Sequence, residues 1–221
     1  GMAVASAMAD FIFMEEKNAK LFVNSPNAID GNRVEKCDTS SAAFQSEETG
    51  LVDFTGSEED ILSQIRSLVT ILPANNEDDM SYSECTDDLN RVCSDLENYA
   101  GATDLALAQI SDDNFFLEVK KNYDKSMVTG FIRLNGTTVG CVANRTAVYA
   151  ADGVKEDEFD AVLSANGAEK AAKFVSFCDA FNIPLLTLVN VKGYKACKCT
   201  ERRIAKNAGR LTYAFANASV P

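Results

Sequence analysis

The sequence predicts an α/β fold, and three features of its second half carry the prediction. Two β-rich runs within residues 126–144 are joined by Asn135-Gly136, the dipeptide that type I′ hairpin turns favour because both positions need a positive φ. Apolar residues at helical spacing and then a nearly continuous apolar run follow the hairpin. The expected elements are a helix at 164–182, a strand at 184–191 and a helix at 201–217. Strands that alternate with helices in this way indicate helices packed on a sheet.

The first half predicts fewer elements. Residues 10–15 form a short run rich in β-formers, which indicates a buried strand. Ser57 precedes three carboxylates at 58–60, which predicts a helix start because acidic side chains are favoured in the first turn. Apolar residues then recur at helical spacing until Pro73.

Two acidic stretches predict irregular chain. Residues 73–88 carry a proline, paired asparagines and an acidic run, with few large apolar side chains, so they mark the best domain boundary. A short helix is expected at 104–110. Residues 152–160 hold five acids and predict a solvated loop.

Composition excludes several function classes. The 221 residues carry a net charge of −12, which argues against a nucleic-acid binder because that role needs a basic face. No apolar run approaches the roughly 18–20 residues that span a bilayer, and no secretory signal is evident. The absence of histidine excludes Ser–His–Asp and Cys–His catalysis and every zinc site that uses histidine. The sequence itself implies no metal.

The seven cysteines predict reduced thiols in a cytoplasmic protein, because secreted disulfide frameworks usually have an even number. Cys197 and Cys199 form one close pair, and Lys195 and Lys198 beside them would lower a thiol pKa. The alternative is two incidental cysteines on a loop. No second close pair supports a zinc site.

The segment Lys192-Gly193-Tyr194 follows the apolar strand and carries the candidate catalytic residues, Gly193 and Tyr194. Ligands of α/β sheets gather at the carboxyl ends of strands, and glycine allows a sharp turn with free backbone N–H groups. Such donors stabilise an enolate or a tetrahedral oxyanion without histidine. A simple turn without a ligand is the alternative.

Positive charge is concentrated around this segment. Residues 192–210 hold seven basic residues and one acidic residue, a local net charge of +6. Lys192, Lys195, Arg202 and Lys206 are the candidate substrate-binding residues, because a basic face suits a ligand with phosphates or carboxylates. Arg202, Lys206 and Arg210 recur every four residues, which places them on one helix face. The alternative is contact with an acidic surface of another subunit.

Several segments resemble the carboxyltransferase subunits of biotin-dependent acyl-CoA carboxylases and decarboxylases, the group of propionyl-CoA carboxylase β and methylmalonyl-CoA decarboxylase α. The segments with the most specific match are 115–118, 122–123, 130–140, 171–185, 188–194 and 211–221. Residues 9–14 and 71–76 fit more loosely.

The resemblance implies a crotonase-like fold, a ββα superhelix in each of two halves. Residues 1–72 are similar to the last part of the N-terminal half, 73–112 form an acidic linker with short helices, and 113–221 are similar to the first part of the C-terminal half. It also implies transfer of a carboxyl group between biotin on a carrier protein and an acyl-CoA such as propionyl-CoA, between subunits of a homo-oligomer. Paired backbone amides would stabilise the enolates.

Departures from the family pattern predict a truncated chain that is inactive alone. In the family, a glycine pair of the acyl side lies just upstream of the segment that matches residues 3–14, where Gly1-Met2 stand here. The glycine-rich turn of the biotin side would lie beyond Pro221. Lys192 replaces a proline of many relatives, so the acyl preference does not carry over. The alternatives are a non-catalytic interaction or assembly module and another crotonase-type enzyme such as a hydratase, although no glutamate pair lies beside Gly193.

Overall fold

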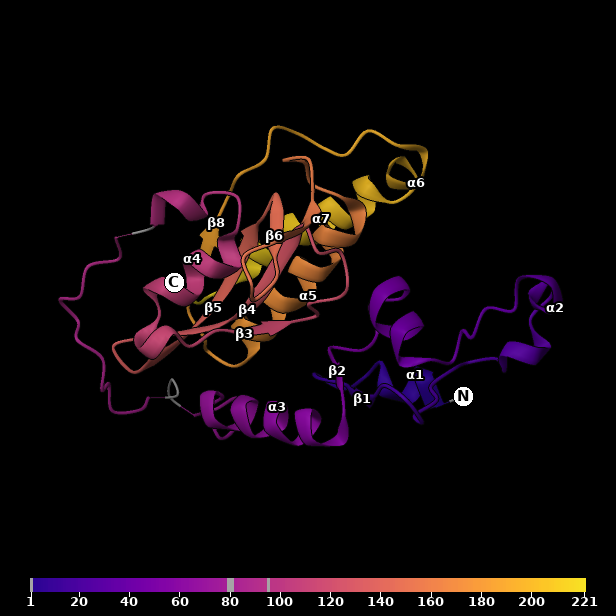
Figure 1. Ribbon diagram of the computed structural model, residues 1–221, viewed down its shortest axis with the longest axis horizontal. Coiled ribbons are helices and arrows are strands. Elements are labelled where there is room, and N and C mark those ends of the chain that lie inside the picture. Colours follow the sequence, from indigo (N-terminus) through magenta and orange to yellow (C-terminus); the bar gives the residue numbers. More distant parts are fainter. Residues whose placement is uncertain (1, 79–81, 95) are drawn as a thin grey trace. The chain divides into compact units, whose positions relative to one another are not determined.

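The computed structural model describes residues 2–78, 82–94 and 96–221, which form two compact units (Figure 1). The first unit comprises Gly1–Ser67 and Lys120–Tyr123, and the second comprises Leu68–Val119 and Asp124–Pro221. The second unit contains the hairpin and all of the candidate site residues.

The first unit contains a small parallel sheet. Strand β1 (Phe13–Glu15) pairs with β2 (Phe54–Gly56), and Met14, Ala42 and Val52 form the buried core beside it. The helical segments of this part of the chain are α1 (Met2–Ser6), η1 (Pro26–Ala28), α2 (Asn32–Glu35), η2 (Phe44–Glu48) and α3 (Glu58–Ile71). The start of α3 is the predicted one, since the Ser57 hydroxyl accepts the Asp60 N–H at 3.2 Å.

A four-stranded sheet in the order β3-β4-β5-β8 organises the second unit. Its strands are β3 (Leu117–Val119), β4 (Met127–Leu134), β5 (Thr137–Asn144) and β8 (Leu185–Leu188). Strands β4 and β5 form the predicted hairpin, in which Asn135 has φ 50° and Gly136 has φ 78°. Asp112 holds this turn by accepting the N–H groups of both residues, at 3.0 and 2.6 Å.

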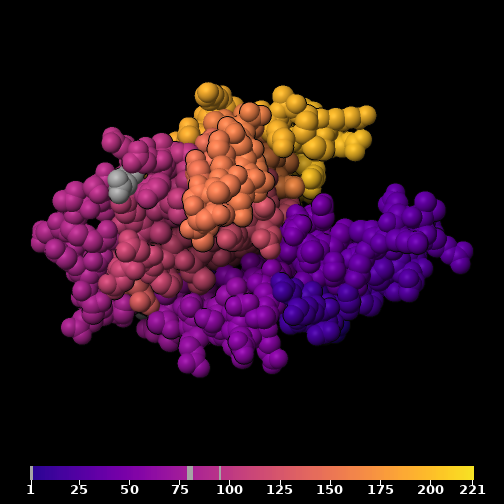
Figure 2. All heavy atoms as spheres, in the orientation of Figure 1, coloured from indigo at the N-terminus to yellow at the C-terminus, as the bar shows by residue number. Residues whose placement is uncertain are grey.

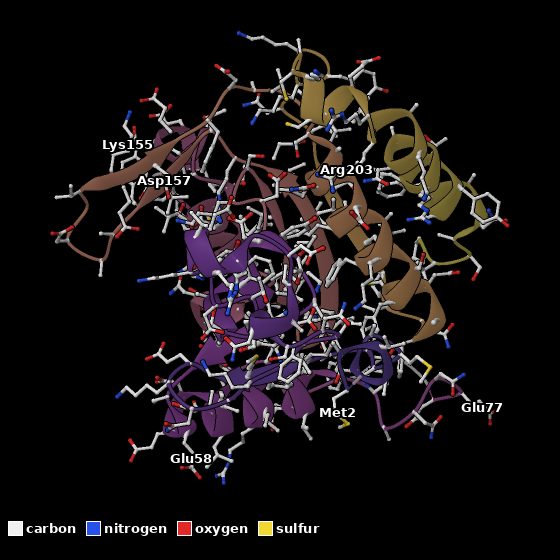
Figure 3. All side chains as sticks on the ribbon, turned by 90° about the vertical axis from the view of Figure 1, so that its right-hand side faces the viewer. Met2, Glu58, Glu77, Lys155, Asp157 and Arg203 are labelled. Atoms are coloured by element: carbon white, nitrogen blue, oxygen red, sulfur yellow. The ribbon has the colours of Figure 1, made fainter. Side chains whose placement is uncertain are left out.

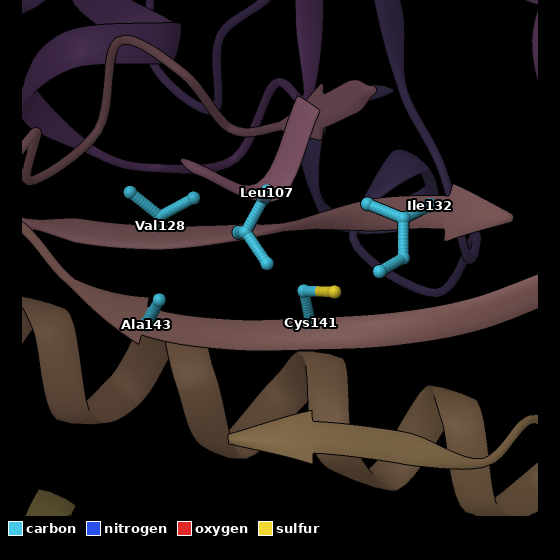
Figure 4. Packing of buried hydrophobic residues seen from close by; sticks show 5 residues of the cluster. All are labelled: Leu107, Val128, Ile132, Cys141 and Ala143. Carbon is cyan, nitrogen blue, oxygen red and sulfur yellow. The ribbon is translucent and has the colours of Figure 1, made fainter. Parts of the chain in front are cut away.

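Helices cover both faces of this sheet. Helix α4 (Thr103–Ile110) inserts Leu107 among Val128, Ile132, Cys141 and Ala143 on one face (Figure 4). Phe131 points to the other face because side chains alternate along a strand, and its ring lies 5.0 Å from that of Phe174 on α5 (Ala165–Ala180).

The remaining elements lie outside these two layers. Strands β6 (Ala147–Tyr149) and β7 (Lys155–Glu158) form an antiparallel arm, on which Figure 3 labels Lys155 and Asp157. Helix α7 (Ile204–Asn217) packs on α5, and the short α6 (Lys198–Glu201) precedes it. The second unit also contains the 3₁₀ turns η3 (Leu96–Tyr99) and η4 (Asp112–Asn114). None of the helices built from the described residues has the length and apolar character needed to cross a membrane.

Candidate functional site

The loop after β8 lies against the segment that leads into α5. Leu163 donates its N–H to the Gly193 carbonyl at 2.9 Å, and the Lys195 N–H donates to the Leu163 carbonyl at 2.9 Å. A third hydrogen bond joins the Lys192 N–H to Ala161 O at 2.8 Å. These bonds form a parallel bridge between Leu163 and Tyr194 that fixes the course of residues 192–195.

The segment at Leu163 is itself fixed by the start of α5. Ser164 is the N-cap of α5, and its hydroxyl accepts the Gly167 N–H at 2.8 Å. The same hydroxyl donates to the Asp124 carboxylate, which also accepts a hydrogen bond from Ser126. The 192–195 loop is therefore anchored through residue 163 to the N-terminus of α5, which Ser164 caps.

Two N–H groups of the loop are left for a ligand. The Lys192 N–H donates to the Ala161 carbonyl, so it is not free to bind a ligand. No group of the described residues accepts a hydrogen bond from the N–H of Gly193 or of Tyr194. In this parallel bridge Leu163 makes both hydrogen bonds, to residues 193 and 195, so the N–H of Tyr194 faces away from the segment at 163.

The loop is exposed rather than packed in the interior. Tyr194 is 63% exposed, and Lys192, Gly193 and Lys195 are also exposed. A Cβ atom at Gly193 would meet no heavy atom within 4 Å. An oxygen atom of a ligand can therefore approach the backbone at this position.

Lys195 lines a cavity of about 370 Å³ beside the N-cap of α5. Three carboxylates also line it (Asp124, Glu158 and Asp160), together with Lys125. Acidic side chains outnumber the two lysines, so this cavity does not favour an anion.

Lys206 lines a second cleft of about 670 Å³ between α5 and α7. Lys173 from α5 and Arg210 from α7 also line this cleft, and Glu169 is its one acidic side chain. Asn207 joins the two helices by donating to the Ala165 carbonyl at 2.9 Å. Three cations and one carboxylate give this cleft the positive charge that an anionic group needs.

The structure does not bring all of the candidate residues together. Arg202 is the C-cap of α6 and lies outside α7, so it does not continue the helix face of Lys206 and Arg210. Figure 3 labels Arg203 where the two helices meet, and Figure 2 shows the residues around α6 in gold at the surface. The candidates thus divide between the 192–195 loop and the α5–α7 cleft.

Lys173, which lines the α5–α7 cleft, was not among the candidate residues predicted from the sequence. The available signal was its spacing, because Glu169 and Lys173 lie four residues apart and therefore share one face of α5. The face that packs against α7 becomes known only when the two helices are placed.

Comparison with known proteins shows similarity along the whole chain. The model of the family described as carboxyl transferase domain matches residues 1–221. The propionyl-CoA carboxylase beta chain of Roseobacter denitrificans is 32% identical over 234 residues, which covers 100% of this chain and 44% of that protein. The methylmalonyl-CoA decarboxylase subunit alpha of Propionigenium modestum is 30% identical, with 100% and 43% covered.

A solved structure agrees with these relatives. The transcarboxylase 12S hexamer, with methylmalonyl-coenzyme A and methylmalonic acid bound, is 31% identical and superposes with a TM-score of 0.84. The match covers 100% of this chain and 43% of the transcarboxylase chain. The chain thus spans less than half the length of the relatives that it matches.

Proposed function

The chain belongs to the carboxyl transferase domain family, and from this premise we propose that it serves in carboxyl transfer between biotin and an acyl-CoA. The likeness to transcarboxylase 12S confirms the α/β, crotonase-like fold class expected from the sequence. We assign residues 1–72 to the N-terminal half of the family architecture, 73–112 to a linker and 113–221 to the C-terminal half.

The exposed N–H groups of Gly193 and Tyr194 carry this proposal. They lie on the loop that follows strand β8. Hydrogen bonds to residues 161 and 163 hold the backbone on either side of them. A donor that is fixed before the ligand arrives needs no reorganisation when charge develops, which makes it effective in stabilising an oxyanion. We assign this role to the two N–H groups.

The loop offers backbone N–H donors, which suit an oxygen atom of a biotin-borne carboxyl group or of the biotin ring. Biotin, when bound, supplies the ureido nitrogen that carries the carboxyl group. Gly193 and Tyr194 would donate N–H hydrogen bonds to an oxygen that becomes negative during transfer, and the absence of a Cβ at Gly193 leaves room for its approach. Lys192 and Lys195 would add positive charge beside that oxygen.

The relatives also suggest partners. We propose a biotin carboxyl carrier protein as the source of biotin, an acyl-CoA as the second substrate, and a homo-oligomer as the assembly. Lys206 and Arg202 would contact phosphate or carboxylate groups, with Lys206 acting from the α5–α7 cleft.

A titration with free biotin tests the loop directly. Binding is the primary readout because the chain spans 44% of the length of the Roseobacter relative. We expect the backbone ¹H–¹⁵N signals of Gly193 and Tyr194 to shift saturably, and those of Lys192 and Lys195 to shift less because their N–H groups are already hydrogen-bonded. Saturable shifts confined to other regions would contradict the proposal.

Two substitutions at position 193 separate the N–H from the side chain. Gly193→Ala keeps the N–H and meets open space, so biotin binding should be retained. Gly193→Pro removes the donor and should weaken binding by about three- to tenfold, the value of one hydrogen bond. Where carboxyl transfer to an acyl-CoA is measurable, the same variant should lose roughly 10²–10³ in rate. If both variants bind alike, the site belongs elsewhere and an assembly role becomes the better hypothesis.

A further inference from the structure

Cys197 and Cys199 bring two thiols together at the surface, two residues beyond the 192–195 loop. Their Sγ atoms lie 3.0 Å apart. Both cysteines are free, Cys199 is exposed and Cys197 is partly exposed. The pair is therefore accessible to a small reagent and close enough for one sulfur to react with the other after a small movement.

Thr200 prepares Cys197 for reaction. The Thr200 N–H donates to Cys197 Sγ at 3.4 Å, and its hydroxyl lies 3.2 Å from the same sulfur. Hydrogen bonds from Cys199 and then from Thr200 lower the pKa of Cys197 to about 7. A thiol with this pKa is substantially thiolate at neutral pH, and the thiolate is the form that attacks an oxidant.

The other cysteines are in different surroundings. Burial raises the pKa of Cys141 to about 12 and raises that of Cys178 further, so these two thiols stay protonated in the core. Cys37 is exposed like Cys199, but it lies 160 residues from Cys197 in the sequence, in the first unit. It therefore provides an internal reference for an exposed thiol without a partner cysteine nearby in the sequence.

We propose that Cys197 and Cys199 form a reversible oxidation site that reacts with hydroperoxides to give an intramolecular disulfide. The Cys197 thiolate attacks the peroxide, the S–O bond forms, the O–O bond breaks, and the leaving oxygen takes a proton to become water or an alcohol. Cys199 then attacks the oxidised sulfur, the S–S bond forms and a water molecule leaves. The two thiols lose two electrons in total, and the peroxide gains them.

The position of the pair gives the modification a consequence. The disulfide would enclose Lys198 and so join the residue before α6 to a residue of its first turn. Lys195, two residues earlier, carries the N–H that anchors the candidate loop to Leu163. Oxidation would therefore constrain the chain immediately after that anchor.

Mass spectrometry of the full chain tests the site independently of activity. The protein is treated with hydrogen peroxide at neutral pH, the remaining thiols are alkylated, and trypsin is added without reductant. Trypsin cleaves after Lys195, Lys198 and Arg202, so peptides 196–198 and 199–202 separate when the thiols are free. We expect them to stay linked after oxidation and to separate again after dithiothreitol.

Two variants identify the order of the steps. Cys199→Ser removes the second thiol, so Cys197 should accumulate as a sulfenic acid that dimedone traps. In Cys197→Ser, oxidation at position 199 should slow by about tenfold, because the activated thiolate is gone. Absence of the linked peptides, linkage of either cysteine to a residue of another chain, or oxidation of Cys37 as fast as Cys197 would each overturn the proposal.

Discussion

Lys120 and Asp53 form a buried ion pair, with Lys120 Nζ 3.0 Å from Asp53 Oδ1 and side-chain exposures of 6% and 2%. The second Asp53 oxygen accepts the Ile12 N–H at 2.8 Å, and the Lys120 ammonium also donates to the Gly50 carbonyl. The pair thus joins residues 120–123 to the segments around β1 and β2 within the first unit.

Removal of one partner of this pair should be strongly destabilising. Lys120→Met leaves the Asp53 carboxylate buried without its cation, and we expect the free energy of unfolding to fall by about 3–5 kcal/mol. Urea denaturation followed by circular dichroism measures the loss. The double variant Lys120→Met, Asp53→Asn should recover much of it, because the amide keeps an acceptor for Ile12 and carries no charge. A single variant as stable as the parent would show that the pair contributes little.

Alanine substitutions at Gly136, in the hairpin turn, and at Gly153 should differ in how much they destabilise the protein. Both Gly136 and Gly153 have positive φ, 78° and 83°. A Cβ at Gly136 would lie 1.9 Å from the Ser83 carbonyl oxygen, whereas a Cβ at Gly153 would meet nothing within 4 Å. Gly153→Ala should therefore cost about 1 kcal/mol of backbone strain, and Gly136→Ala should cost clearly more because Ser83 must move. Thermal unfolding of the two variants compares them, and equal losses would contradict the turn geometry.

Local patterns predicted much of this fold. The Asn135-Gly136 turn, the Ser57 start of α3 and the Ser164 start of α5 each depend on residues close in sequence, and all three are confirmed. Strand β7 was not expected, because the charged residues Lys155–Glu158 indicated a solvated loop. The strand forms through backbone pairing with β6, which needs no apolar side chains.

Features set by distant residues were less predictable. The apolar run 184–191 predicted a strand over its whole length, but β8 comprises only Leu185–Leu188, at the edge of the sheet and with Thr187 exposed. An apolar run alone does not say how many neighbours a strand has. The expected helix at 201–217 divides between α6 and α7, which separates Arg202 from Lys206. The loop at Gly193 was found from sequence because glycine after a strand is a local signal.

The thiol of Cys197 predicts a pH dependence within an accessible range. Its pKa is lowered to about 7, so alkylation by iodoacetamide should accelerate from pH 5.5 to 8.5 with a midpoint near 7. Because folding lowers this pKa, the contribution to stability is present above the ordinary thiol range and is lost as the pH falls through about 7. Cys199→Ser should move the midpoint upward if the sulfur–sulfur contact is the main cause. An unchanged midpoint would assign the shift to Thr200.

The cleft between α5 and α7 should bind an anion through Lys206, Arg210 and Lys173. Coenzyme A is the probe, because its phosphates match three clustered cations. In Lys206→Glu, we expect the Kd for coenzyme A at low salt to rise by about tenfold or more, the value of a charge-assisted hydrogen bond. Lys155→Glu on β7 changes the net charge equally at an exposed position outside the cleft, so it measures the general electrostatic effect. Calorimetric titration of both variants decides the matter: if they weaken binding to the same extent, coenzyme A responds to the overall charge of the protein and not to this cleft.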